Sequence, residues 1–194
     1  MEFIGHKEFF DALKPSGVRV ETEHPGPARC VLTPGEPAGL SPSVVIFGES
    51  ENHPGDPPGA RRVAAETGAL PALISAILRK EHLREVALCP AMVWAPIVDL
   101  VAFDLAQDER WSDIDAEAAL HLRTRDPLLL DAADLRLCET IAGAVFEHGE
   151  PDTHDFAVVA IGAPLTLNVL QRGRLVVWCG NPALADVIGA LGGG

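Results

Sequence analysis

The densest run of possible metal ligands lies at residues 147–155, where two imidazoles and four carboxylates fall within nine residues. His148, Asp152 and His154 are the side chains best suited to hold a divalent cation such as zinc. Water bound to such an ion would be the nucleophile of a metal-dependent hydrolase. The spacing matches neither a helical HExxH motif nor a calcium loop. An ordinary solvated connection is therefore the simpler interpretation, and the hydrolase is the alternative hypothesis.

A second candidate is the stretch 49–56, which follows an apolar run typical of a buried strand. Ser50 and His53 could form a nucleophile and its base. The residues around Ser50 lack the GxSxG pattern of a nucleophile elbow, and two neighbouring glutamates would oppose a developing oxyanion. We interpret the stretch as a surface loop available for recognition. The chain also has no glycine-rich phosphate-binding motif, so nucleotide binding is disfavoured.

Acidic residues are concentrated in the middle of the chain. Residues 97–155 hold 15 acidic and 4 basic residues, within a net charge of −13 for all 194. Nucleic acids and anionic membranes are poor partners for such a surface, because binding them depends on clustered Lys and Arg. A protein with a basic surface is the better partner. Asp108, Glu109, Trp111 and Asp113 are the expected contacts, because Trp111 stands among charged residues and not in an apolar run.

These observations favour a non-enzymatic protein-binding module, such as an adaptor, a chaperone-like accessory or an inhibitor, that presents an acidic surface to a basic partner. A homodimer formed through an exposed sheet edge is compatible with this role. No cofactor is expected. A simpler explanation of the acidic surplus is that it keeps a slightly apolar domain in solution.

The four cysteines are widely spaced and form no CxxC motif, which removes zinc-ribbon and thioredoxin-like interpretations. Reduced, buried thiols are expected. The first residues lack the pattern of a secretory signal, and no apolar run reaches the roughly 20 residues of a membrane helix. A soluble, cytoplasmic protein is therefore expected. Only 3 of the 15 basic residues are lysine, and Ala, Gly and Pro are abundant, a bacterial-like composition typical of a GC-rich genome.

Apolar residues at helical spacing predict helices at 2–13, at 61–67 and 70–82 (one broken helix or two short ones), at 131–148 and at 182–191. Asp131 is the expected N-cap of the helix at 131–148. The stretch 97–105 suits a helix and a strand equally well.

Alternating or continuous apolar runs predict strands at 18–22, 29–33, 43–48, 85–89, 117–125, 156–162, 165–171 and 175–180. The first two should pair as a hairpin, and the last three should form a meander. On 117–125, His121, Arg123 and Arg125 would share one face and neutralise Glu117. Together the elements predict a single α+β domain over 1–194, with a largely antiparallel sheet, a C-terminal β-meander and three to five packed helices.

Overall fold

A computed structural model describes residues 1–22, 28–34, 39–48, 56–105 and 120–193. An eight-stranded sheet runs through it in the order β1-β7-β6-β8-β9-β10-β4-β5, and a separate hairpin is formed by β2 and β3. The strands are β1 (Glu2–Phe3), β2 (Val18–Thr22), β3 (Ala28–Leu32), β4 (Ser43–Gly48), β5 (Arg61–Ala64), β6 (Glu85–Pro90), β7 (Leu128–Asp131), β8 (Phe156–Ala160), β9 (Leu165–Leu170) and β10 (Arg174–Cys179). All neighbours in the large sheet are antiparallel except β4 and β5.

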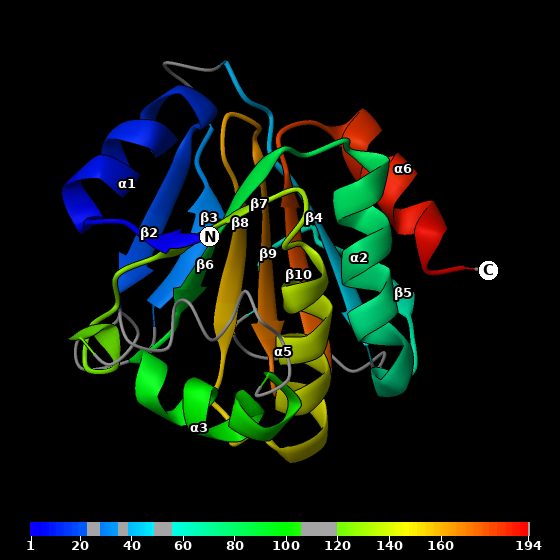
Figure 1. The fold of residues 1–194 in the computed structure, drawn as a ribbon. Helices are drawn as coiled ribbons and strands as arrows, with labels where there is room; N and C mark the ends of the chain where they lie inside the picture. Colours follow the sequence, from blue (N-terminus) through cyan, green and yellow to red (C-terminus); the bar gives the residue numbers. More distant parts are fainter. Residues whose placement is uncertain (23–27, 35–38, 49–55, 106–119, 194) are drawn as a thin grey trace.

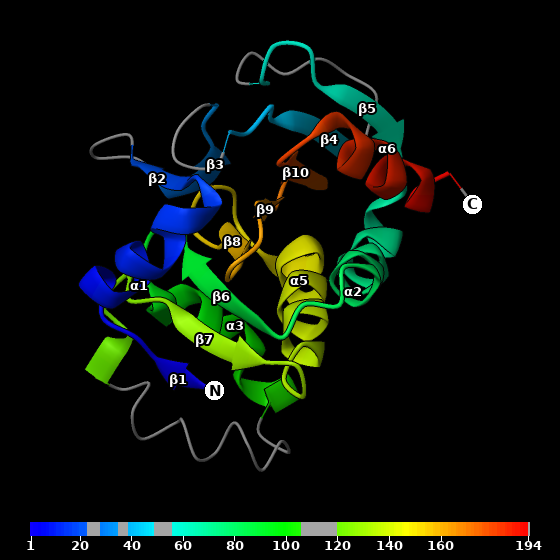
Figure 2. The same ribbon diagram turned by 90° about the horizontal axis from the view of Figure 1, so that it is seen from above.

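Five α-helices occur among the described residues. They are α1 (His6–Leu13), α2 (Leu70–Lys80), α3 (Trp94–Leu105), α5 (Arg136–His148) and α6 (Pro182–Leu191). One face of the sheet is covered by α2, α5 and α6, while α1 and the β2–β3 hairpin lie on the other face (Figures 1 and 2). The structure thus confirms the α+β class, the mostly antiparallel sheet and the C-terminal β8–β9–β10 meander. No helix of the described segments is both long enough and apolar enough to cross a membrane.

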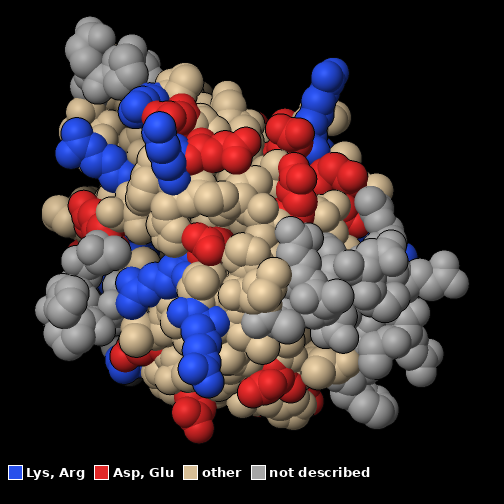
Figure 3. Space-filling model, turned by 60° about the vertical axis from the view of Figure 1, so that its left-hand side comes forward, with Lys and Arg blue, Asp and Glu red and all other residues tan. Residues whose placement is uncertain are grey.

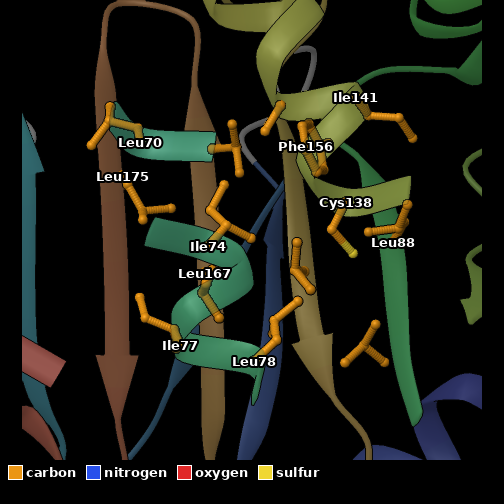
Figure 4. Close-up of a cluster of buried hydrophobic side chains, with 14 of the residues drawn as sticks. Leu70, Ile74, Ile77, Leu78, Leu88, Cys138, Ile141, Phe156, Leu167 and Leu175 are labelled. Atoms are coloured by element: carbon orange, nitrogen blue, oxygen red, sulfur yellow. The ribbon is translucent and has the colours of Figure 1, made fainter. Parts of the chain in front are cut away.

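The larger hydrophobic core lies between the sheet and the helices α2, α3, α5 and α6. Residues of β8 alternate between the faces, so Phe156 and Val158 enter this core while Ala157 and Val159 enter a smaller one beneath α1 and the hairpin. Figure 4 shows the inner sides of α2 and α5 against β8, β9 and β10. Each large apolar side chain buried here contributes roughly 1.5–3 kcal/mol to folding.

Polar side chains on the sheet hold the hairpin to its other face. The Cys30 backbone N–H donates to Asn168 Oδ1 at 2.9 Å, and Asn168 Nδ2 donates to the Cys30 carbonyl at 2.8 Å. Thr166 Oγ1 donates to the same carbonyl at 3.0 Å. Both side chains are buried in strand β9. The sheet therefore fixes the position of Cys30 through its backbone.

The last third of the chain folds as the sequence predicts. The strands β9 and β10 pair from Leu165↔Cys179 to Leu170↔Arg174, and Gly173 takes a positive φ of 70° in the turn between them. The closing helix α6 begins at Pro182, and Asn181 Oδ1 caps it by accepting a hydrogen bond from Leu184 N at 2.9 Å.

Two predicted elements are of the wrong type. The stretch 61–67 is not a helix: residues Arg61–Ala64 form β5, the edge strand parallel to β4. The stretch 120–125 is not a strand, because His121 ends a helical turn and Thr124 N donates to the His121 carbonyl at 2.8 Å. A short sequence pattern does not determine secondary structure by itself. In segments of this length, tertiary contacts decide whether a helix, a strand or a turn forms.

Two helix starts also differ from the sequence-based expectation. At the N-terminus, β1 precedes α1, so the helix starts at His6 and not at residue 2. Asp131 ends β7, and its Oδ1 accepts a hydrogen bond from Ala133 N at 2.7 Å in a turn, so it does not cap α5, which starts at Arg136. The ambiguous stretch 97–105 is helical and belongs to α3.

Candidate functional site

The residues expected to contact a protein partner lie outside the described residues. These residues are Asp108, Glu109, Trp111 and Asp113. Ser50 and His53, the possible nucleophile and base of the stretch 49–56, also lie outside the described residues.

The three expected metal ligands are near one another in the chain but do not assemble into a site. The His148 ring lies on the surface, 3.5 Å from Glu147 Oε1, and Asp152 is exposed in a turn with a φ of 64°. His154 Nδ1 accepts a hydrogen bond from Glu150 N at 2.9 Å, which shapes the turn before β8. Within the described ranges, no group of three or more His, Cys, Asp or Glu side chains is arranged to hold a metal ion.

A different polar cluster lies at the lower end of the sheet in Figure 1, where β6 ends and β7 and β8 begin. Asp126 Oδ1 lies 2.7 Å from His6 Nδ1, and Asp126 Oδ2 lies 3.0 Å from His121 Nδ1. An ionised carboxylate can only accept, so each imidazole donates through Nδ1. This leaves Nε2 of both rings available to a ligand or to solvent.

Neighbouring elements hold this His6–Asp126–His121 cluster in place. Trp94 Nε1, at the start of α3, donates to the Asp126 carbonyl at 2.7 Å. The Phe3 ring of β1 stacks on His121, with ring centroids 4.4 Å apart and an interplanar angle of 12°. The cluster therefore joins the N-terminal segment to the segment that leads into β7.

The hydrogen bonds of Asp126 control its ionisation. Partial burial raises the pKa of its carboxyl group, but hydrogen bonds from His121, His6 and Thr124, and the charge of His6, outweigh that effect. The pKa of Asp126 therefore lies below its ordinary value. Asp126 is a carboxylate at neutral pH and orients both imidazoles.

His6 also belongs to the wall of a cavity of about 200 Å³ beneath α1 and the hairpin. Most of the wall is apolar, with Phe9 and Phe10 from α1 and Val20 from β2. The remaining lining residues are Ala28, Cys30, Cys89, Pro90, Arg125, Pro127 and Ala157. An apolar cavity with a few convergent polar groups is the usual form of a small-molecule site.

Among the described residues of this cavity wall, Arg125 is the only one that always carries a charge. It is half-buried, and its Nη2 lies 3.7 Å from Met92 Sδ, a weak acceptor. Among the residues that the structure describes, no carboxylate forms an ion pair with Arg125. Its neighbour Arg123 is exposed to solvent.

Two thiols meet in the same wall. Cys30 comes from β3 and Cys89 from β6. Burial raises the pKa of Cys89 well above its ordinary value, and the side-chain hydrogen bond with Cys30 and the charge of Cys30 raise it further. The Cys89 thiol is therefore protonated at neutral pH.

Asp155 is a buried carboxyl group at the same end of the sheet. Its Oδ1 accepts a hydrogen bond from Gln171 N at 2.8 Å. Desolvation by burial raises the pKa of Asp155; the negative charge of Asp152 adds to this effect, while the Gln171 hydrogen bond and the Arg29 charge oppose it. Ionised Asp155 is thus a cost to folding at neutral pH.

A second ion-pair cluster closes the far side of this end of the sheet. Asp56 accepts from Arg62 at 2.6 Å and from Arg174 at the start of β10. Asp56 and Arg174 are both almost completely buried, so the cluster joins the loop before β5 to the body of the sheet. We assign it a structural role.

A wider groove, of about 570 Å³, lies over the part of the sheet near β4 and β10. Its wall includes Trp178 and several prolines. The charged residues in its wall are Arg61 and Asp186, which pair with each other at 3.1 Å. Within the described part of its wall, the groove therefore lacks the unpaired charge that distinguishes the smaller cavity.

Comparison with protein-family models, with curated proteins and with solved structures finds no match to this chain. The site can therefore be interpreted only from its own geometry.

The sequence pattern pointed to two residues of this site but predicted the wrong structure around them. It grouped His121 with Arg125, but on a strand that does not form and with Glu117, which is outside the described residues. His6 and Asp126 are 120 positions apart, and Cys30 and Cys89 belong to different elements. Since no local pattern joins such residues, only the strand order could have brought them together.

Proposed function

We propose that the protein binds a small, mostly apolar anion in the cavity beneath α1, with the acidic group of the ligand facing Arg125. The observation that supports this proposal is a half-buried arginine in a mostly apolar wall, with no carboxylate paired to it in the described part of the chain. A charge held away from water without a partner is costly. A carboxylate ligand would remove that cost by forming two parallel hydrogen bonds with the guanidinium.

The size and lining of the cavity restrict the ligand. Its volume of about 200 Å³ is below the roughly 300–1,000 Å³ of sites for drug-sized molecules. A short aliphatic or single-ring aromatic acid fits this description. Phe9, Phe10 and Val20 would contact its hydrocarbon part. His6 Nε2 would accept a hydrogen bond from a hydroxyl group of the ligand, where it has one, because the Nδ1–H of the ring is donated to Asp126.

A thermal-shift series with matched pairs of ligands tests this proposal. Benzoate and hexanoate are compared with benzamide and hexanamide, which have the same hydrocarbon part without the charge. We expect the acids to raise Tm and the amides to have little effect, because a ligand at 100 times its Kd stabilises the folded state by about 2.7 kcal/mol. Equal shifts from acids and amides would contradict a role for Arg125, and no shift from any member would refute the ligand class.

A second candidate function is the protein-binding module with an acidic surface. It is favoured by the 15 acidic and 4 basic residues of the segment 97–155. The exposed acidic residues in the described part of that segment are Asp99, Asp131, Glu147, Glu150 and Asp152. However, Lys and Arg are interspersed with Asp and Glu on the face that carries α1 and the hairpin (Figure 3). The described residues on that face therefore form no wholly acidic surface.

The test of this candidate is capture of a basic protein from cell extract at low and high salt. If the acidic segment makes the contact, retention should weaken as salt screens the charges and should fall in the triple variant D108K/E109K/D113K. A partner retained equally by both proteins at both salt concentrations would eliminate this surface.

A further inference from the structure

The wall of the small cavity brings together two thiols that are 59 positions apart in the chain. Cys30 is almost completely buried, with 1% of its surface exposed, whereas Cys89 is partly accessible. Both side chains line the same cavity, and the neighbouring Cys30 thiol contributes to the raised pKa of Cys89. They line a cavity, whereas an ordinary core cysteine is enclosed by packing on all sides.

The backbone fixes the position of both cysteines. Ala28 N donates to the Ala91 carbonyl at 2.8 Å, which ties the start of β3 to the residue after β6, two residues from each cysteine. Asn168 holds the backbone of Cys30 from the other side. Cys89 is paired with Ala157 of β8 within the sheet. The pair is thus preorganised, so little entropy is lost when both sulfurs bind one ligand.

We propose that Cys30 and Cys89 form a two-sulfur site for one soft monovalent cation, of which Cu(I) is the type. Thiolate ligands select soft ions, and Cu(I) accepts two sulfur ligands in a linear arrangement. Zinc normally takes four protein ligands in a structural site, and no group of three or more suitable side chains occurs among the described residues.

The charge balance of this site can be written completely. One Cu⁺ binds two thiolates, two protons leave to solvent, and no electron is transferred. The bound unit carries one negative charge. Arg125 lies in the same wall, and its positive charge offsets that of the bound unit. The proposal does not depend on the carboxylate ligand, although both use this cavity.

The other two cysteines provide matched controls. Cys138 and Cys179 are buried in the larger core on the opposite face of the sheet. Desolvation raises the pKa of each to about 12, with the charge of Glu81 adding to the effect at Cys179. Neither residue lines the cavity. They should therefore not compete for the ion.

The experiment is a competition between the protein and a coloured Cu(I) chelator, bathocuproine disulfonate, under anaerobic reducing conditions. We expect the wild type and the double variant C138S/C179S to withdraw one equivalent of Cu(I). The variants C30S and C89S should each withdraw less than about a tenth of an equivalent. Circular dichroism establishes that each variant is folded, and C30A and C89A replace any serine variant that is not.

A second measurement uses maleimide labelling of the folded protein, stopped with excess thiol before the labels are counted. Copper should slow the labelling of Cys89, the partly accessible thiol, in the wild type and not in C30S. Failure of the wild type to withdraw copper would overturn the proposal, as would withdrawal of as much copper by C30S or C89S as by the wild type. The variant R125M distinguishes the two ligands of the cavity, because it should lose carboxylate binding while still binding copper, more weakly than the wild type.

Discussion

At the scale of single residues, the most informative side chain is Asp126. It accepts from two imidazoles at once, His6 at 2.7 Å and His121 at 3.0 Å. An asparagine can accept from one imidazole through Oδ1, but its amide would oppose the second Nδ1–H. The substitution D126N therefore removes about one charged hydrogen bond, each of which contributes roughly 1.5–3 kcal/mol.

We expect D126N to lower the free energy of unfolding by about that amount at pH 7. Because the pKa of Asp126 is lowered in the fold, its stabilisation is fully present above the ordinary carboxyl pKa of about 3.9 and is lost as pH falls through the lower folded value. Denaturant titrations at pH 7, 5 and 3 measure this. The exposed Asp99 gives the control D99N, which should change stability by less than about 0.5 kcal/mol. A stability difference between the wild type and D126N that is as large at pH 3 as at pH 7 would contradict this account.

Asp155 should behave in the opposite way. Its folded pKa is raised, first by desolvation, so its stabilising contribution is present below the ordinary pKa and is lost as pH rises through the folded value. We expect D155N to be more stable than the wild type at pH 7, because the amide oxygen can still accept from Gln171 N. D155A, which cannot, should be less stable than D155N. Thermal melts of the three proteins at pH 7 decide this, and a D155N protein that melts below the wild type would refute it.

At the scale of residues, a single sequence reveals candidate functional side chains only where they lie close together in the chain. Residues 147–155 are dense in ligands, yet their side chains serve a turn and the surface. Chain proximity is a weak guide, because a helix end and a turn point neighbouring side chains in different directions. His6 and Asp126 carried no signal, since nothing in a single sequence joins positions 120 apart.

At the scale of elements, the strands β8, β9 and β10 were predictable because they are buried on both faces and end in glycine-containing turns. The edge strand β5 was not, because three of its four residues are exposed and its pairing with β4 depends on contacts that no local pattern contains. The stretch 120–125 was wrongly predicted to be a strand, because its local pattern likewise contains nothing about the tertiary contacts that make it a turn. A strand that is buried on both faces is recognisable from its apolar sequence, whereas an exposed edge strand is not.

The attachment of the hairpin to the sheet gives a prediction for elements. Asn168 is 4% exposed and satisfies both backbone groups of Cys30. The substitution N168A leaves a buried N–H without its partner and weakens the bonding of the carbonyl, at a cost of about 1–3 kcal/mol for each unsatisfied group. T166V removes one bond to a carbonyl that Asn168 still satisfies, so its effect should be about 1 kcal/mol.

Hydrogen exchange on N168A locates this effect. The amides of β2 and β3 should exchange faster relative to those of β8 and β10, because the hairpin would open separately from the sheet. Uniform acceleration across all strands would show that the hairpin and the sheet unfold as one unit.

At the scale of the whole molecule, the fold class and the meander were predictable from the sequence, but the strand order was not. That order places β6 between β7 and β8, and it brings His6, Arg125, Cys30 and Cys89 to one cavity. The polar residues with unusual surroundings gather at one end of the sheet, which is where binding sites form when helices and a hairpin cover both faces.

The most direct test is isothermal titration calorimetry of the best acid from the thermal-shift series against the wild type, R125M and R123M. Arg123 is a matched control because it is exposed two positions away. We expect R125M to bind at least about 10-fold more weakly, which corresponds to about 1.4 kcal/mol, and R123M to bind like the wild type. Equal affinity of the wild type and R125M for the acid would contradict the assignment of this cavity as an anion site.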